Sequence, residues 1–166
     1  MKSAAFKVLA LTCLLAASLG TARASLKVGD PLPDLAACQL AGQLPDLLAG
    51  KVVLLDFWAS WCDSCADSLL ILDDLQKKYG SASLVIIAVN VDDSQADMEK
   101  FLKLHPVSIA TVRDARQILG DKVNVSVMPT AILFGRDGKA AYLHGSFHGS
   151  DTRAAYEQEI SILLKH

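Results

Sequence analysis

The chain has 166 residues, 52% of them hydrophobic, and a formal net charge of −2. This length favours a single domain. No run of basic residues is present that could bind nucleic acid or an anionic membrane surface, so we expect neither as a partner. Four cysteines, among them one C-x-x-C pair, make redox or metal chemistry the first functional classes to consider.

The first 24 residues have the pattern of a secretory signal peptide. Two lysines precede an apolar stretch from Val8 to Leu19, and Ala22-Arg23-Ala24 forms a small-x-small cleavage site. The apolar stretch is too short for a mature membrane-spanning helix. We therefore predict a signal peptide over residues 1–24 and one domain over residues 25–166. An uncleaved N-terminal anchor is the alternative.

Export would place the domain in an oxidising compartment, where a C-x-x-C pair can form a disulfide. The bacterial style of the signal predicts the periplasm. Cleavage would remove three of the 16 basic residues and leave 13 against 18 acidic ones. Cys13 lies in the apolar stretch without the small residue that precedes a lipoprotein cysteine, so lipidation is not expected.

The predicted elements begin after a turn-rich segment, residues 25–49, which contains three prolines and two glycines. Val52–Trp58 is a continuous apolar run broken by one carboxylate, which is typical of a strand buried on both faces. Ala66–Tyr79 has a helical period of leucines, and Gly80 is a plausible helix stop.

The rest of the chain alternates between strands and helices and then ends in a hairpin and a helix. Ser94 is a good N-cap for the second helix, and residues 135–138 form the hairpin turn. This order predicts an α/β fold with a central mixed sheet flanked by helices. The remaining elements are expected at Leu84–Val91, Ser94–Leu104, Val107–Val112, Asp114–Leu119, Thr130–Phe134, Lys139–His144 and Asp151–Lys165.

Cys62 and Cys65 follow the first buried strand and lie at the start of the helix. Unpaired N–H groups and the macrodipole there would stabilise the Cys62 thiolate and lower its pKa. A purely structural disulfide between them would close a very small loop and add little stability, while a zinc site needs about four ligands. We predict a redox-active pair, in which Cys62 attacks a partner disulfide and Cys65 resolves the mixed disulfide.

Trp61-Cys62-Asp63-Ser64-Cys65 after a buried strand resembles the thioredoxin superfamily, and residues 50–62 resemble the exported TlpA/ResA-type thiol–disulfide oxidoreductases. Residues 29–35 are similar to the segment that precedes a short hairpin in that family, and residues 94–112 to its inserted helix–strand unit. The resemblance implies a thioredoxin-like fold with an N-terminal extension and this insertion, and no cofactor beyond the two cysteines.

Asp56 is a carboxylate inside the buried strand. Burial there raises its pKa and costs free energy unless the group is paired or protonated. The resemblance implies that Asp56 lies beneath the disulfide and assists proton transfer with Cys65, although many TlpA/ResA-type proteins carry Asn at this position. The alternative is a side chain that faces a solvent-lined edge and has no role.

The resemblance also implies a substrate-binding surface. It makes the bond between Met128 and Pro129 cis and places it opposite the cysteines, with Met128 offering backbone hydrogen bonds to an extended substrate. From the sequence alone, Pro129 would be assigned to a turn. Trp61 is expected at the rim of this surface and Trp58 in the core.

Two acidic residues are candidates for tuning the cysteine pKa values. Asp63, between the cysteines, should repel the Cys62 thiolate and raise its pKa, which favours a reducing or intermediate protein. Asp93 matches an acidic residue that some ResA-type reductases place near the disulfide. Its alternative role is that of an acidic residue preceding the helix that begins at Ser94.

Other side chains carry weaker predictions. His144 and His148 are four residues apart, but Gly145 follows a strand end, so they share no helical face and no metal site is predicted. Cys38 is interpreted as an inert thiol, with a second redox role as the alternative. Leu70 stands where relatives usually have a helix-kinking proline, so a straighter helix is expected.

The sequence therefore predicts a periplasmic thiol–disulfide oxidoreductase that reduces disulfides of exported proteins. The resemblance implies apocytochrome c and copper-site assembly factors as candidate substrates and a membrane thiol donor. We also expect the protein to act as a monomer. The alternatives are an oxidase or isomerase of similar fold, and a copper metallochaperone that binds metal through Cys62, Cys65 and a histidine.

Overall fold

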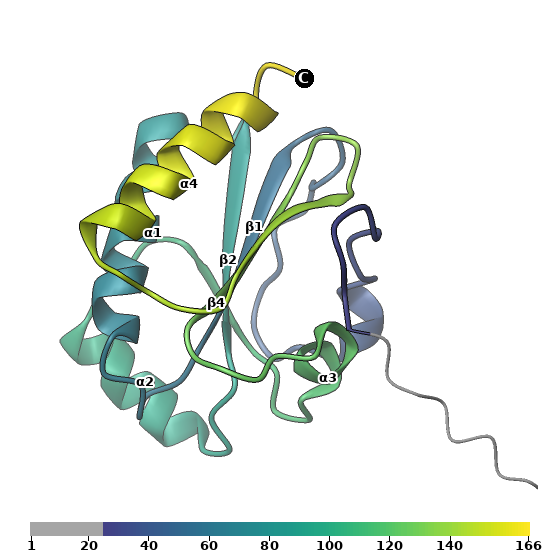
Figure 1. Cartoon of the computed structure of the whole chain (residues 1–166). Coiled ribbons are helices and arrows are strands. Elements are labelled where there is room, and N and C mark those ends of the chain that lie inside the picture. Colours follow the sequence, from purple (N-terminus) through teal and green to yellow (C-terminus); the bar gives the residue numbers. More distant parts are fainter. Residues whose placement is uncertain (1–24) are drawn as a thin grey trace, which may run out of the picture.

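The computed structural model describes residues 25–166, so the predicted signal peptide lies outside the described residues. Figure 1 shows a central sheet with helices on both sides. Within residues 25–166, no helix is both long and apolar enough to cross a membrane. The elements are η1 (Ala36–Cys38), β1 (Val52–Trp58), α1 (Cys65–Tyr79), β2 (Leu84–Asn90), α2 (Gln95–Leu104), β3 (Ala110–Arg113), α3 (Ile118–Val123), β4 (Thr130–Phe134), β5 (Ala140–His144) and α4 (Ser150–Leu163).

The sheet is mixed and has the strand order β3-β2-β1-β4-β5. β1 pairs in parallel with β2, and β2 with β3, whereas β4 and β5 are antiparallel. Every residue of β1 is buried, as its continuous apolar run predicts for a central strand covered on both faces. The predicted insertion is present as α2 and the edge strand β3. The fold is therefore thioredoxin-like, with the expected mixed sheet.

The two faces of the sheet have different cover. α1, α2 and α4 pack on one face, and α3 together with the N-terminal segment packs on the other (Figure 1). Alternate residues of β1 divide between them, because successive strand side chains point to opposite faces. Val52, Leu54 and Trp58 face the first side, together with both cysteines of the C-x-x-C pair. We call the packing between the sheet and α1, α2 and α4 the α1 layer.

The N-terminal segment contacts both edges of the sheet. Pro31 forms an isolated antiparallel bridge with Lys139, next to β5, and Ala41 forms one with Arg113 of β3. The Gly29 N–H also donates to the Ala140 carbonyl over 2.8 Å. The short hairpin implied by the family resemblance is absent from residues 25–51, because this segment pairs with the main sheet instead of with itself.

Two element boundaries differ from the prediction because carboxylates take backbone N–H groups from neighbouring segments. Asp73 of α1 accepts from the N–H groups of Ser108 and Ile109 over 2.6 and 3.1 Å, so β3 begins only at Ala110 and not at Val107. Asp114 accepts from the Ile118 and Gly120 N–H groups over 2.9 and 2.8 Å. Residues 114–117 therefore form a turn, and α3 begins at Ile118, four residues later than predicted.

Candidate active site

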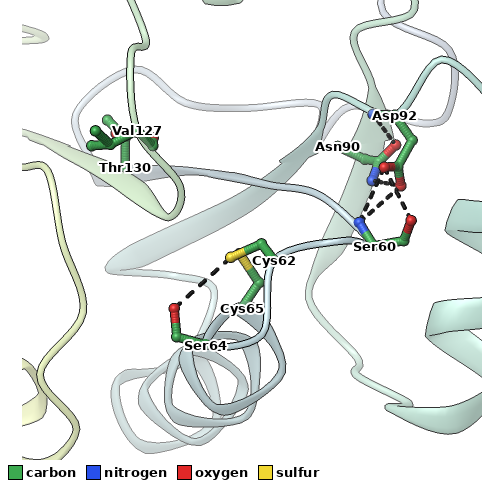
Figure 2. Close-up of a disulfide and its surroundings, with 8 residues drawn as sticks. All are labelled: Ser60, Cys62, Ser64, Cys65, Asn90, Asp92, Val127 and Thr130. Carbon is green, nitrogen blue, oxygen red and sulfur yellow. Dashed lines mark hydrogen bonds between the residues drawn. A yellow bond between two sulfur atoms is a disulfide. The ribbon is translucent and has the colours of Figure 1, made fainter.

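The two cysteines of the C-x-x-C pair form a disulfide in the loop between β1 and α1 (Figure 2). Their Cα atoms are 5.4 Å apart. Cys62 keeps 7% of its surface exposed, whereas Cys65 is fully buried beneath it. Cys62 is therefore the sulfur that a partner molecule can reach first.

The helix begins at Cys65, one residue before the predicted Ala66. Its N-cap is Ser64, so Asp63 and Ser64 both precede the helix. The Cys65 N–H donates to the Cys62 carbonyl over 3.1 Å in a tight turn. This turn leaves Asp63 exposed and brings the Ser64 hydroxyl to 3.9 Å from the Cys62 sulfur, a contact that the sequence analysis missed.

Asp56 is fully buried, and within the described residues neither of its carboxylate oxygens has a hydrogen-bond partner. Its neighbours on the two adjacent strands are Ala88 and Ala131, which supply no counter-charge. Burial therefore raises the pKa of Asp56 well above its ordinary value. Because Asp56 shares the face of Leu54 and Trp58, it points into the α1 layer. The alternative of a solvent-lined edge is excluded.

Two further buried polar atoms in the α1 layer have no hydrogen-bond partner within residues 25–166. They are the indole Nε1 of Trp58 and the hydroxyl of Ser68, one helical turn after Cys65. Trp58 is a core residue, as predicted, and its ring lies 5.0 Å from that of Phe101 in α2. The α1 layer, which also holds both cysteines, is therefore enclosed but not wholly apolar.

Asp92 holds the loop that precedes the disulfide. Its carboxylate, 4% exposed, accepts from the Ser60 N–H over 3.0 and 3.1 Å and from the Ser60 hydroxyl over 3.1 Å (Figure 2). The Asn90 side-chain amide donates to it over 2.8 Å. Asp92 therefore connects the end of β2 to the residue before Trp61. From the sequence, the neighbouring Asp93 is the predicted candidate, and no local pattern points to Asp92.

A hollow of about 400 Å³ joins the disulfide loop to the loop before β4. The bond between Met128 and Pro129 is cis, as the resemblance implies. The Thr130 hydroxyl donates to the Val127 carbonyl over 2.7 Å and closes this loop (Figure 2). The hollow brings Trp61, Asp93 and Met128 together, and Trp61 is 67% exposed. Its lining residues are Trp61, Val91, Asp93, Gln117, Val125, Ser126, Val127 and Met128.

Cys38 lies on the opposite side of the sheet from the disulfide, in the packing that includes α3. Its thiol is free and buried and donates to the Asp34 carbonyl over 3.2 Å, and the Lys122 ammonium lies 3.6 Å from the sulfur. Burial raises the pKa of Cys38, although the nearby Lys122 acts in the opposite direction.

The two histidines considered in the sequence have separate partners. His144 lies 2.8 Å from Glu159, and His148 lies 2.9 Å from the Ser146 hydroxyl. Within residues 25–166, no three His, Cys, Asp or Glu side chains group in a way that could hold a metal ion. Leu70 is exposed on α1, which is continuous from Cys65 to Tyr79.

Residues 50–140 match the protein family described as thioredoxin-like. The chain belongs to this thioredoxin-like family. The thiol-disulfide oxidoreductase ResA of Bacillus subtilis (strain 168) is 32% identical over 139 residues, which cover 80% of this chain and 77% of the relative. The ResA protein of Bacillus cereus is 28% identical over 116 residues, 69% of this chain and 67% of that relative.

Solved structures agree with this assignment. A Chlorobium tepidum protein described as thiol:disulfide interchange protein DsbE is 34% identical and superposes with a TM-score of 0.75, covering 84% of this chain and 99% of that one. This thioredoxin-like protein is therefore a thiol–disulfide oxidoreductase of the TlpA/ResA type, and its Cys62–Cys65 disulfide is the pair on which that activity depends. Such enzymes act on disulfides of proteins.

Proposed function

We propose that this protein reduces disulfides of exported proteins, with Cys62 and Cys65 as its only redox carrier. The observation that carries the proposal is one partly accessible sulfur, Cys62, beside a hollow large enough for a polypeptide segment, together with a buried carboxyl group, Asp56, that has no hydrogen-bond partner within residues 25–166. A structural disulfide would need neither the hollow nor the carboxyl.

In the reducing direction, the Cys62 thiolate of the dithiol form attacks one sulfur of the substrate disulfide. A mixed disulfide forms, and the other substrate sulfur leaves with the electron pair and takes up a proton. Cys65 then gives its proton to the Asp56 carboxylate and attacks the Cys62 sulfur. The bond to the substrate breaks, its second sulfur leaves as a thiolate, and the Cys62–Cys65 disulfide forms again. Two electrons have then moved from the protein to the substrate.

Trp61, Met128 and Pro129 are the proposed substrate-binding residues. Met128 stands just before β4, where its backbone can pair with an extended segment. The exposed Trp61 ring forms the facing wall of the hollow. The lining combines apolar side chains with the polar Gln117 and Ser126, and Asp93 is its charged residue. An extended segment next to a substrate cysteine would lie along it.

The reducing direction is proposed from the charge beside the nucleophile. Asp63 is exposed next to Cys62. A negative charge there destabilises a neighbouring thiolate, and a protein whose dithiol is less stabilised is a better reductant. We expect a reduction potential below about −200 mV. A value near −120 mV, the strongly oxidising end, would contradict the reducing direction.

Location and partners are proposed from the sequence and from the relatives. The signal pattern in residues 1–24 supports the periplasm. One structural neighbour is an exposed lipoprotein thioredoxin of Streptococcus pneumoniae strain TIGR4. It is 28% identical and superposes with a TM-score of 0.59, covering 69% of this chain and 86% of that one. Apocytochrome c and copper-site assembly factors are proposed substrates, with a membrane thiol as electron donor. The protein is proposed to act as a monomer.

The test is to trap the substrate in the native compartment. In Cys65→Ser, the mixed disulfide on Cys62 cannot be resolved, so conjugates that disappear on treatment with dithiothreitol should accumulate. The double variant Cys62→Ser/Cys65→Ser should give none, and Cys38→Ser/Cys65→Ser should give the same conjugates as Cys65→Ser. Absence of conjugates on Cys62 would overturn the proposal.

A further inference from the structure

The hollow between the disulfide loop and the loop before β4 contains polar groups that the described residues leave without a partner. Asp93 is the charged residue of its lining, and Gln117 and Ser126 are polar and uncharged. None of these three side chains makes a hydrogen bond or an ion pair within residues 25–166. The hollow therefore presents a carboxylate, an amide and a hydroxyl that are available to a bound molecule.

Arg113 of β3 holds the backbone at Asp93 and leaves the carboxylate free. Its Nη1 donates to the Asp92 carbonyl over 3.3 Å and to the Asp93 carbonyl over 3.1 Å. Within the described residues, the guanidinium makes no ion pair with the Asp93 carboxylate. The side chain of the preceding Asp92 is bonded to Ser60 and Asn90. Asp93 therefore extends its carboxylate from a backbone that is already held in place, so little ordering is needed when it binds a partner.

The indole of Trp61 is a second feature of the hollow that suits a cation. Its ring is largely exposed and lines the same hollow as Asp93. The face of an aromatic ring attracts the ammonium of lysine or the guanidinium of arginine, and the apolar stem of either side chain can pack along the ring. The carboxylate supplies the counter-charge. A basic side chain can therefore use both groups, whereas an acidic side chain would be repelled by Asp93.

A second, smaller hollow touches the disulfide loop at Ser60 and has a different charge balance. It measures about 190 Å³ and is lined by Ser60, Asp97, Lys100, Phe101 and Leu104. Asp97 and Lys100 give it one charge of each sign, so it should favour neither a basic nor an acidic side chain. Selectivity for a cation is therefore expected only where Trp61 and Asp93 meet.

We propose that the hollow binds a lysine or arginine side chain close to the cysteine of the substrate segment, with Asp93 as the specificity-determining residue. The cation lies against the Asp93 carboxylate and the Trp61 ring, and Gln117 and Ser126 offer further acceptors. Trp61 immediately precedes Cys62, so a segment bound here lies next to the nucleophile. This inference rests on the proposed function, in which Cys62 attacks a substrate disulfide, and adds a preference for basic segments over acidic ones.

The test uses the reduced full chain and short peptides whose single cysteine forms a mixed disulfide with thionitrobenzoate. The Cys62 thiolate attacks the peptide sulfur, and thionitrobenzoate leaves with the electron pair as a coloured thiolate, which stopped flow follows. The peptides carry Lys, Gln or Glu on either the N-terminal or the C-terminal side of the cysteine and are otherwise identical and uncharged. The measured quantity is the ratio of the rate constants for the Lys and Glu peptides.

In the wild type, we expect the Lys peptide to react about fivefold faster than the Glu peptide, the upper end of what one exposed ion pair contributes. This preference should hold on one side of the cysteine only, and added salt should weaken it by screening. Asp93→Asn should bring the ratio close to one. Asp93→Lys should invert it, which a merely structural role of Asp93 would not produce. Asp97→Asn is the matched control, because Asp97 lines the smaller hollow, and should keep the wild-type ratio.

A ratio near one in the wild type, or an Asp93→Lys variant that keeps the wild-type preference, overturns the inference. An equal preference on both sides of the cysteine also overturns it, because it would report the net charge of the protein and not the hollow.

A wild type that releases no thionitrobenzoate from any peptide contradicts the proposed nucleophile Cys62 instead. Binding then decides the inference. Peptides with serine in place of the cysteine are titrated while the fluorescence of Trp61 is recorded. The Lys peptide should bind about fivefold more tightly than the Glu peptide, and equal affinities would overturn the inference.

Discussion

Two buried carboxyl groups, Asp92 and Asp56, have opposite surroundings. Asp92, beside the disulfide loop, accepts hydrogen bonds from the Ser60 backbone, the Ser60 hydroxyl and the Asn90 amide. Asp56, in the strand β1 that leads into the loop, accepts none within the described residues. Donors stabilise an ionised carboxylate, whereas an enclosed carboxyl without donors keeps its proton.

The different surroundings of the two carboxyl groups suit them to different roles. Asp92 is suited to holding the loop in place, because its bonds span the gap between β2 and the residue before Trp61. Asp56 is suited to moving a proton, because neither of its states is locked by a partner. Unsatisfied polar groups in otherwise well-packed proteins concentrate at functional sites, and Trp58 and Ser68 extend that unsatisfied region.

The largest effect is expected from Asp92→Ala. The substitution leaves the buried donors of Ser60 and Asn90 without an acceptor, so the free energy of unfolding should fall by about 3 kcal/mol. Urea denaturation of the oxidised protein measures this change. Asp93→Ala is the matched control, because the Asp93 side chain is exposed and only its carbonyl accepts from Arg113. It should stay within about 0.5 kcal/mol of the wild type. Equal losses in both variants would contradict the division of roles.

The next effect is a pH-dependent gain in Asp56→Asn. In the unfolded chain, Asp56 ionises near its ordinary pKa of about 3.9, whereas the folded protein holds the proton to higher pH. The unfolded state therefore binds fewer protons above about pH 4, and wild-type stability attributable to Asp56 falls as pH rises until the folded carboxyl ionises. Asparagine has no such dependence.

The difference in unfolding free energy between Asp56→Asn and the wild type should therefore grow in favour of the variant. From pH 4 to pH 8, we expect this change to go in one direction only, toward the variant. Urea denaturation at the two pH values measures it. A difference that does not change with pH would mean that Asp56 has a partner in the folded protein.

The smallest effects should come from two serines: the Ser60 hydroxyl is bonded to Asp92, whereas the Ser68 hydroxyl, like Asp56, has no hydrogen-bond partner within the described residues. Ser60→Ala removes one hydroxyl bond to Asp92 but leaves the backbone bonds, so about 1 kcal/mol of stability should be lost. Ser68→Ala removes a buried hydroxyl that has no hydrogen-bond partner within residues 25–166, so stability should stay level or rise slightly. Both are measured by urea denaturation at one pH. A larger loss for Ser68→Ala would reverse the expected order.

The elements that local chemistry determines were predictable from the sequence. β1 and β4 begin and end where their apolar runs do, at Val52–Trp58 and Thr130–Phe134. The Ser94 hydroxyl accepts from the Asp97 N–H at the start of α2, which is the predicted cap. The disulfide also lies where the C-x-x-C pair indicates. Each of these depends on residues within a few positions of one another.

The remaining features depend on contacts between distant segments, which no local pattern encodes. β3 and α3 were misplaced because Asp73 and Asp114 accept backbone N–H groups across loops. Asp92 and Asp93 are adjacent and chemically identical. Which of them is buried depends on the disulfide loop, where Ser60 contacts the Asp92 carboxylate. The pairing of Ala131 with both Asp56 and His144 likewise depends on the register of β1, β4 and β5.

The pairing of the N-terminal segment with both sheet edges has a consequence for handling the protein. The outer strands of an open sheet offer unpaired backbone groups to other chains. Residues 29–41 occupy part of each edge, near Lys139 and near Arg113. A version trimmed to begin just before β1 would keep every residue of the redox site and yet expose both borders, inviting association between copies. Residues 29–41, which contribute nothing to the redox site, thus protect the domain that carries it from association.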